Sequence, residues 1–222
     1  MTAPTRQLPL PFAEAPSYAA EDFCAAPCNA LARTWLQTPQ AWTNGRMVLW
    51  GEPGCGKSFM LHLWAQSCRA VIHQGHTLRG LPAPPATAIA IDDADTVPQE
   101  TTLLHLLNAA SEAGHPVLLT AREPPSRQTH LLPDLVSRLR ASLAVEISPP
   151  DDAMLTQLLF RLAAARQLIL NAQVSQFLLT QLPRTPAALR EAIARLDRAA
   201  LAAGGKITRP LAAQILADLI SP

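Results

Sequence analysis

The sequence has no excess of charge of either sign. Its 222 residues include 18 basic and 17 acidic side chains, which gives a formal net charge of +1. A protein that holds nucleic acid mainly by electrostatic attraction carries a strongly basic surface. The near balance argues against that class, and a hydrophobic content of 49% excludes a disordered or collagen-like chain.

Membrane and export signals are also missing. The uncharged stretch from Gln167 to Pro183 is broken by polar side chains such as Asn171, so no run approaches the ~20 apolar residues of a membrane-spanning helix. The first residues contain prolines and no continuous apolar segment, which argues against a signal peptide. The cysteines are Cys24, Cys28, Cys55 and Cys68. They form no C-x-x-C pair, so we expect reduced thiols, no zinc site and a cytoplasmic location.

Proline, by contrast, is abundant. The chain has 21 prolines, where average usage of about 5% would give roughly 11. Residues 1–20 are rich in Pro, Ala and Thr and show no hydrophobic periodicity, which predicts a flexible leader.

Short apolar runs alternate with helical patterns up to residue 150. We expect strands over 47–50, 70–73, 86–91, 116–121 and 144–147, and helices over 29–38, 58–69 and 101–113. In the first of these helices Leu31, Trp35 and Leu36 share one face. The alternation predicts an α/β domain over residues 21–150, with a parallel five-stranded sheet and helices on both faces.

The pattern changes after Pro149 and Pro150. Helices are predicted from Asp151 and Asp152 to Arg166, over 172–182, from Thr185-Pro186 to Gly204-Gly205, and from Thr208-Arg209-Pro210 to Ile220. Each start has a capping residue or a proline at the first helical position. No strand pattern occurs, so residues 151–222 are predicted to form a small all-helical domain.

Residues 51–58, GEPGCGKS, match the G-x-x-x-x-G-K-[ST] motif between a predicted strand and a predicted helix. The backbone of Gly51, Gly54, Cys55 and Gly56 can wrap phosphates, helped by the positive end of the helix dipole. Lys57 would reach the terminal phosphates, and the Ser58 hydroxyl can ligate Mg²⁺. A chance glycine-rich turn would lack this strand and helix. We therefore predict a site for ADP or ATP with Mg²⁺.

Acidic residues follow the third predicted strand. Asp92 is placed to ligate Mg²⁺ beside the phosphate loop. Asp93 stands where related ATPases commonly carry a glutamate that polarises the attacking water, but its side chain is one methylene shorter. Alternatively Asp93 caps the following helix, and capping is the favoured interpretation for Asp95.

Four more segments extend this pattern. They are residues 18–23 (YAAEDF) with Pro27 and Asn29, 118–125 (LLTAREPP), 132–139 (LPDLVSRL) and 188–191 (ALRE). Together with the phosphate loop they resemble the AAA+ ATPases and, within them, the replication-initiator family of DnaA and Hda. There the segments correspond to the entry motif, the sensor-1 strand, the box with the arginine finger and the sensor-2 helix. The resemblance covers roughly residues 18–218 and implies an AAA+ P-loop domain with a helical lid.

The resemblance implies a role for single residues. Thr120 would sit near the γ-phosphate as sensor 1, and Arg190 would reach the phosphates from the lid as sensor 2. Arg138 would act as an arginine finger on nucleotide bound by a neighbouring molecule, an effect of ~10³–10⁵ in rate. Arg140 stays open as the finger, and an isolated arginine is more often a solvated ion-pair partner.

The leader contains a further motif. Gln7-Leu8-Pro9-Leu10-Pro11-Phe12 resembles the peptide by which bacterial proteins dock on the DNA polymerase III sliding clamp. Its prolines hold the segment extended, so docking costs little entropy. Leu10 and Phe12 would fill an apolar pocket while Gln7 donates a directional hydrogen bond. Leu8 and Pro11 complete the motif.

The leading hypothesis is an Hda-like regulator that docks on the clamp and stimulates hydrolysis of DnaA-bound ATP, which prevents re-initiation of replication. Its own ATP hydrolysis would be weak at most. The chain stops at Pro222, which predicts no DNA-reading domain and no sequence-specific DNA binding. The alternatives are a helicase-loader-type AAA+ ATPase and a clamp-tethered adaptor that does not affect hydrolysis. An arginine finger needs a neighbour, so self-association is possible.

Overall fold

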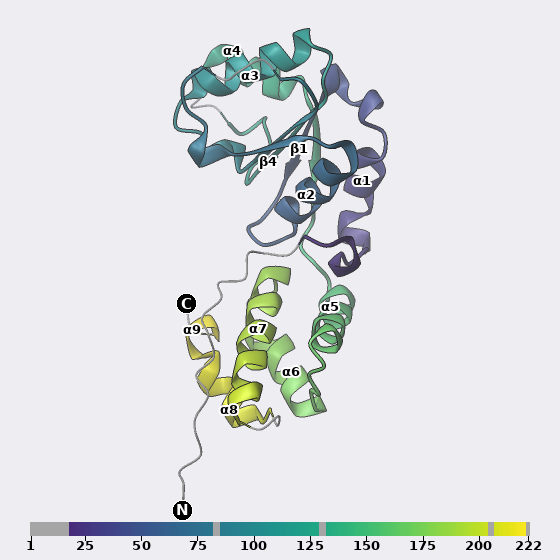
Figure 1. Ribbon diagram of the computed structural model, residues 1–222, viewed down its shortest axis with the longest axis vertical. Helices are drawn as coiled ribbons and strands as arrows, with labels where there is room; N and C mark the ends of the chain where they lie inside the picture. Colours follow the sequence, from purple (N-terminus) through teal and green to yellow (C-terminus); the bar gives the residue numbers. More distant parts are fainter. Residues whose placement is uncertain (1–17, 82–84, 129–131, 204–206, 221–222) are drawn as a thin grey trace, which may run out of the picture. The chain divides into compact units, whose positions relative to one another are not determined.

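The computed structural model describes residues 18–81, 85–128, 132–203 and 207–220 (Figure 1). By their contacts these residues form two compact units, one spanning Tyr18–Pro149 and the other beginning at Pro150. Within the described ranges, no helix is both long and apolar enough to cross a membrane.

The first unit is built on a five-stranded sheet in the order β2-β3-β4-β1-β5. The strands are β1 (Arg46–Trp50), β2 (Val71–Gln74), β3 (Ile89–Asp92), β4 (Val117–Ala121) and β5 (Leu143–Glu146). All of their pairings are parallel. Every residue of β3 and β4 is buried, as expected for central strands covered on both faces. The predicted α/β fold is confirmed.

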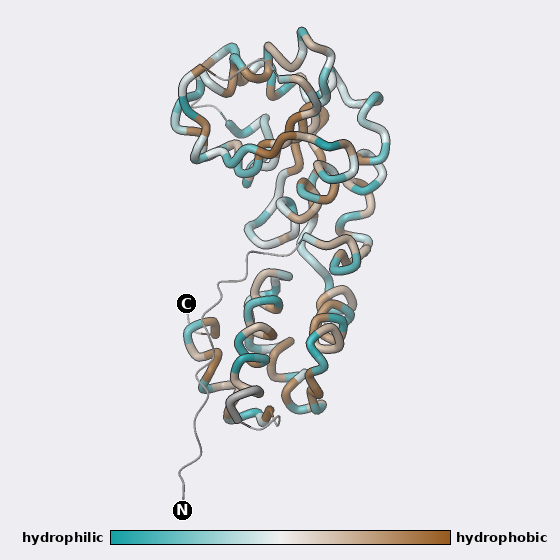
Figure 2. Tube along the Cα trace, viewed as in Figure 1, coloured by the Kyte–Doolittle hydropathy of each residue, from teal (hydrophilic) through white to brown (hydrophobic). Residues whose placement is uncertain are grey.

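Helices cover both faces of the sheet. They are α1 (Pro27–Leu36), α2 (Lys57–Cys68), α3 (Glu100–Glu112) and α4 (Pro133–Arg140). Met47 and Leu49 of β1 pack with α1 and α2 in one apolar cluster, while Val48 faces α3 and α4 in another. Figure 2 shows the hydrophobic residues concentrated on the strands between these layers. Short 3-10 turns connect them, at Ala20–Asp22, Pro39–Ala41, Thr43–Gly45, Gly75–Thr77 and Ala94–Thr96.

The buried face of α1 differs from the predicted one. Ala32 is fully buried, and Trp35 and Leu36 pack beside it, but the side chain of Leu31 is 60% exposed. Residues i, i+3 and i+4 share a helical face, so Ala32 rather than Leu31 completes the set with Trp35 and Leu36. The small alanine allows the helix to approach the sheet closely.

The second unit is helical throughout its described part. Its helices are α5 (Asp152–Ala165), α6 (Ala172–Gln181), α7 (Pro186–Ala203), α8 (Arg209–Ile215) and α9 (Ala217–Ile220). Asp151 caps α5, because its Oδ1 accepts a hydrogen bond of 2.7 Å from the backbone N–H of Met154. Thr208 caps α8 in the same way through Leu211. These starts agree with the capping residues expected from the sequence.

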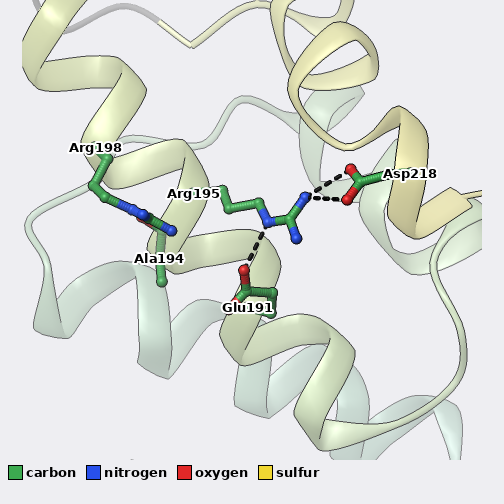
Figure 3. A network of polar contacts seen from close by, with 5 residues as sticks. All are labelled: Glu191, Ala194, Arg195, Arg198 and Asp218. Carbon is green, nitrogen blue, oxygen red and sulfur yellow. Dashed lines mark hydrogen bonds and ion pairs between the residues drawn. The ribbon is translucent and has the colours of Figure 1, made fainter. Parts of the chain in front are cut away.

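The prediction of one last helix up to Ile220 is wrong. The chain leaves the helical conformation at Leu216, whose side chain is fully buried, and α9 begins at the next residue. Figure 3 shows what α9 contacts: Arg195 Nη1 on α7 donates to both carboxylate oxygens of Asp218, at 2.6 and 2.7 Å. Arg195 Nε also donates to Glu191, at 2.6 Å. These hydrogen bonds, first to Asp218, raise the pKa of Arg195, and the break at Leu216 lets α9 reach α7.

Candidate phosphate-binding site

The loop between β1 and α2 has the backbone that its glycines were predicted to allow. Gly51, Gly54 and Gly56 all have positive φ. At Gly51 a Cβ atom would lie 2.6 Å from the backbone oxygen of Ile147, so no larger residue fits there. The loop leads directly into α2, whose first residue is Lys57. The amide groups of the loop and the start of the helix therefore form one concave surface suited to an anion.

The Lys57 ammonium lies inside this loop. Its Nζ donates to the carbonyl oxygens of Gly51, at 2.8 Å, and Glu52, at 3.0 Å, and the residue is only 6% exposed. Burial raises the pKa of the neighbouring Cys55 thiol, which stays neutral. A phosphate oxygen entering the loop would give the ammonium a charged acceptor, which binds more strongly than a carbonyl.

Three predicted residues from three different elements meet at one carboxylate oxygen. Asp92 Oδ1 accepts hydrogen bonds from Ser58 Oγ, at 3.0 Å, and from Thr120 Oγ1, at 2.6 Å. Asp92 and Thr120 are buried at the carboxyl ends of β3 and β4. The hydroxyl of Thr120 also accepts the backbone N–H of Asp93, at 2.8 Å. The parallel sheet brings these residues beside the phosphate loop.

The donor set of this cluster suits Mg²⁺. That ion prefers oxygen ligands at about 2.0–2.1 Å in octahedral geometry, which places adjacent ligand oxygens about 3 Å apart. The hydroxyl oxygen of Ser58 and Oδ1 of Asp92 are 3.0 Å apart. Neither oxygen would have to move far to share an ion.

Asp93 has a left-handed backbone, with φ of 50° and ψ of 54°. It precedes the 3-10 turn at Ala94–Thr96, but its side chain makes no capping hydrogen bond there. Burial, followed by the nearby charges of Asp92 and Asp95, raises the pKa of its carboxyl above the ordinary range. A raised pKa makes a carboxylate a better proton acceptor.

The capping role predicted for Asp95 is wrong. The side chain turns to the sheet instead, and its Oδ2 accepts the backbone N–H of Arg122, at 3.0 Å, just beyond β4. The residue before α3 is Gln99. Asp95 therefore ties the turn after β3 to the end of β4, which stabilises the edge of the sheet that carries the site.

Gly75 supports the unusual backbone of Asp93. A Cβ atom at this position would lie 2.0 Å from the Asp93 carbonyl oxygen and 2.9 Å from Thr96 Oγ1. Thr96 in turn donates its N–H and its hydroxyl to that same carbonyl, at 2.9 and 2.7 Å. The close approach of the two turns thus depends on the missing side chain.

We expect Gly75→Ala to lower the free energy of unfolding by about 3 kcal/mol, because a backbone carbonyl must move to admit the methyl group. Urea unfolding of the two proteins measures the difference. The exposed His76 of the same turn provides the control, since His76→Ala should change stability by less than about 0.5 kcal/mol. Equal stability of Gly75→Ala and the natural protein would contradict the expectation.

Sequence reasoning missed one contact near the loop, made by His62. Its ring stacks on Tyr18 with centroids 3.7 Å apart and planes 11° from parallel, and its Nδ1 lies 2.7 Å from the carbonyl oxygen of Ser58. Phe59, one position beyond Ser58, packs against Tyr18 and Phe23. The spacing of aromatic residues in α2 is the signal that could have indicated this contact. It fastens the segment at Tyr18–Phe23 to the helix that follows the phosphate loop.

The two candidate finger arginines differ in their surroundings. Arg140 Nη2 donates to the carbonyl oxygen of Ser126, at 3.3 Å. Arg138, two residues earlier on α4, makes no hydrogen bond or ion pair through its guanidinium with any residue that the structure describes. Both lie in the last turn of α4, which leads into the amino end of β5. Because β5 runs parallel to β1, this end of the sheet is opposite the one that carries the phosphate loop.

The remaining predicted residues belong to other parts of the chain. Arg190 lies on α7, in the second unit. The motif at residues 7–12 lies outside the described residues. Within the described ranges no group of three or more His, Cys, Asp or Glu side chains could hold a metal ion by itself.

Comparison with known proteins finds similarity in the second unit and in the fold of the whole chain. Residues 151–216 match the family model of the Hda lid domain. Domain III of the replication initiator DnaA from Thermotoga maritima aligns with a TM-score of 0.75 and 19% identity, over 94% of this chain and 99% of that one. The chain thus shares the fold of DnaA domain III, and its residues 151–216 are similar to the lid domain of Hda.

Other AAA+ structures share the fold. DnaA from Aquifex aeolicus bound to AMPPCP aligns with a TM-score of 0.66 and 17% identity, over 81% of this chain and 65% of that one. A single-residue variant of RuvB from Thermotoga maritima aligns with a TM-score of 0.67 and 16% identity, over 91% of this chain and 72% of that one. The predicted AAA+ fold with a small helical lid is therefore confirmed.

Proposed function

We propose that this protein is related to DnaA and binds ADP or ATP at the phosphate loop. The buried Lys57 ammonium would hold the terminal phosphate, and the loop amides would surround the others. Ser58 and Asp92 would hold Mg²⁺, which when bound supplies positive charge to the phosphates. The structure of a DnaA relative with AMPPCP, at 17% identity, supports this proposal through the shared fold. Thr120 would sense the terminal phosphate through its bond to Asp92, and Arg190 would contact the nucleotide from the lid.

We further propose that the protein stimulates hydrolysis of ATP bound to DnaA, with Arg138 as an arginine finger. One observation carries this proposal: Arg138 has no acceptor for its guanidinium among the described residues, whereas the Arg140 guanidinium binds Ser126. A guanidinium delivered to another molecule must not be satisfied within its own chain. Arg138 lies at the end of the sheet opposite the phosphate loop. This position also supports action on a nucleotide bound by a neighbouring molecule, and not on the nucleotide bound by the same chain.

The leader would bring the protein to its place of action. The motif at Gln7–Phe12 would dock on the DNA polymerase III sliding clamp, with Leu10 and Phe12 in an apolar pocket and the two prolines holding the backbone extended. Conversion of DnaA to its ADP form on newly copied DNA would prevent re-initiation. In this role the protein acts in the cytoplasm without reading a DNA sequence itself.

A second candidate function has support from Asp93. Its raised pKa and its position beside Asp92 and Thr120 are what a water-activating base needs. This favours an AAA+ ATPase of the helicase-loader class that hydrolyses its own ATP. Because aspartate is shorter than the usual glutamate, we propose that this activity is weak and that Arg138 carries the main function.

The deciding experiment measures hydrolysis of radiolabelled ATP bound to DnaA, with the sliding clamp loaded on DNA. Adding the natural protein should accelerate hydrolysis, and deleting residues 7–12 should abolish this acceleration while nucleotide binding persists. If the protein binds the clamp but does not change the rate of hydrolysis, it is a clamp-tethered adaptor. If the clamp is not bound either, ATP hydrolysis by the protein itself becomes the stronger candidate.

A further inference from the structure

Arg46, the first residue of β1, is a buried cation with no partner for its charge among the described residues. It is 4% exposed, and its Nε and Nη1 atoms are buried with no hydrogen-bond acceptor in that part of the chain. Nor does a salt bridge join it to any carboxylate that the structure describes. A buried guanidinium normally has a carboxylate partner, because taking a charge out of water costs several kcal/mol. A protein that keeps such a group at this cost has a use for its charge.

The charge that acts on Arg46 is that of a second arginine, Arg138. The start of β1 lies against the end of α4: Asn44 Nδ2 donates to the carbonyl oxygen of Ala141, at 2.9 Å, and Met47 pairs with Leu143 of β5. Ser142 Oγ donates to the carbonyl oxygen of Arg138, at 3.0 Å. Burial, followed by the positive charge of Arg138, lowers the pKa of Arg46.

The acidic residue of α4, Asp134, forms no ion pair with Arg138. Asp134 lies four residues before Arg138, the spacing and order that favour an ion pair on a helix. No ion pair joins them, although the structure describes both residues. The sheet edge therefore carries two guanidinium groups, one buried and one half-exposed, with no carboxylate bound to either among the described residues.

We propose that Arg46 is a positioning residue for Arg138 and forms with it a binding site for the phosphates of a nucleotide held by another molecule. The fixed charge of Arg46 opposes any movement of Arg138 inward to the sheet edge. It also adds positive potential where a polyphosphate would approach, and such an anion would compensate both charges at once. The inference rests on the proposed function of Arg138 and adds the residue behind it.

The first test replaces Arg46 by methionine, which keeps most of the length of the side chain and removes the charge. We expect Arg46→Met to be as stable as the natural protein or more stable, because an unpaired buried charge is lost. Its stimulation of DnaA-bound ATP hydrolysis should nevertheless fall about 10-fold. Arg46→Lys keeps the charge and should retain most of the stimulation. Full stimulation by a folded Arg46→Met protein would overturn the proposal.

A second measurement separates this inference from the proposed function. Tripolyphosphate is added to the full-length Lys57→Met protein, in which the protein's own phosphate loop is impaired, and thermal unfolding is followed. We expect tripolyphosphate to raise the melting temperature, and the rise to disappear when Arg46→Met or Arg138→Ala is added. Such a result without any effect on DnaA would support the site and reject the proposed function. No rise at all, or a rise independent of Arg46, would overturn the inference even if DnaA is stimulated.

Discussion

Replacing Arg138 by alanine should reduce the stimulated hydrolysis of DnaA-bound ATP by about 10³-fold or more. The transferring phosphoryl group spreads negative charge over its oxygens, and a guanidinium from a neighbouring molecule stabilises that charge only in the transition state. The side chain of Arg138 is half-exposed and makes no hydrogen bond or ion pair among the described residues, so its removal should disturb the fold little. Single-turnover measurements on preloaded DnaA give the rate directly.

Arg140→Ala is the matched control for this substitution. It removes the same side chain two residues later on the same helix, but that guanidinium is bound to the carbonyl of Ser126. We expect stimulation within about 2–3-fold of the natural level, since an exposed neutral acceptor contributes little. The reverse outcome, with Arg140→Ala inactive and Arg138→Ala active, would assign the finger to Arg140. Loss of nucleotide binding by Arg138→Ala would contradict the assignment of Arg138 to a site separate from the phosphate loop.

The sheet and the phosphate loop could be predicted because local patterns determine them. A strand buried on both faces is a continuous apolar run, and the glycines of the loop supply its positive φ angles within eight consecutive residues. The start of α5 could be predicted for the same reason, since Asp151 binds an amide only three residues away. Where cause and effect lie within a few residues, the sequence carries the information.

The features that could not be predicted depend on residues far apart in the chain. The break at Leu216 brings Asp218 to Arg195, and Asp95 leaves its own turn to bind the backbone at Arg122. The left-handed conformation of Asp93 is accommodated by Gly75, which the motif does not include. In the sequence Arg46 is an ordinary strand residue, and only the folded structure shows that the end of α4 lies beside the start of its strand.

The same distinction between local and distant causes guides the interpretation of variants near the site. Substitutions within residues 51–58 should affect phosphate binding directly. Substitutions at Gly75 or Asp95 should act indirectly, by displacing Asp93. We therefore expect them to change the free energy of unfolding more than the affinity for nucleotide. Stability and nucleotide affinity must therefore both be measured for every variant near the phosphate loop.

Lys57→Met should weaken the binding of ATP and ADP by roughly 100-fold. The ammonium would make a charge-assisted hydrogen bond to the terminal phosphates, which contributes about 3 kcal/mol, and methionine keeps the buried stem without the charge. The carbonyls of Gly51 and Glu52 lose their donor, but they lie on the loop, where water can replace it. Titration with a fluorescent ATP analogue measures the dissociation constant.

Gln66→Met places the same side chain on an exposed position of the same helix and serves as the control. Its affinity for nucleotide and its melting temperature should match those of the natural protein. If Lys57→Met binds nucleotide as tightly as this control, the ammonium does not contact phosphate and the loop does not work as its motif predicts. If Lys57→Met loses nucleotide yet still stimulates DnaA through Arg138, the two sites act independently, and stimulation does not require the bound nucleotide.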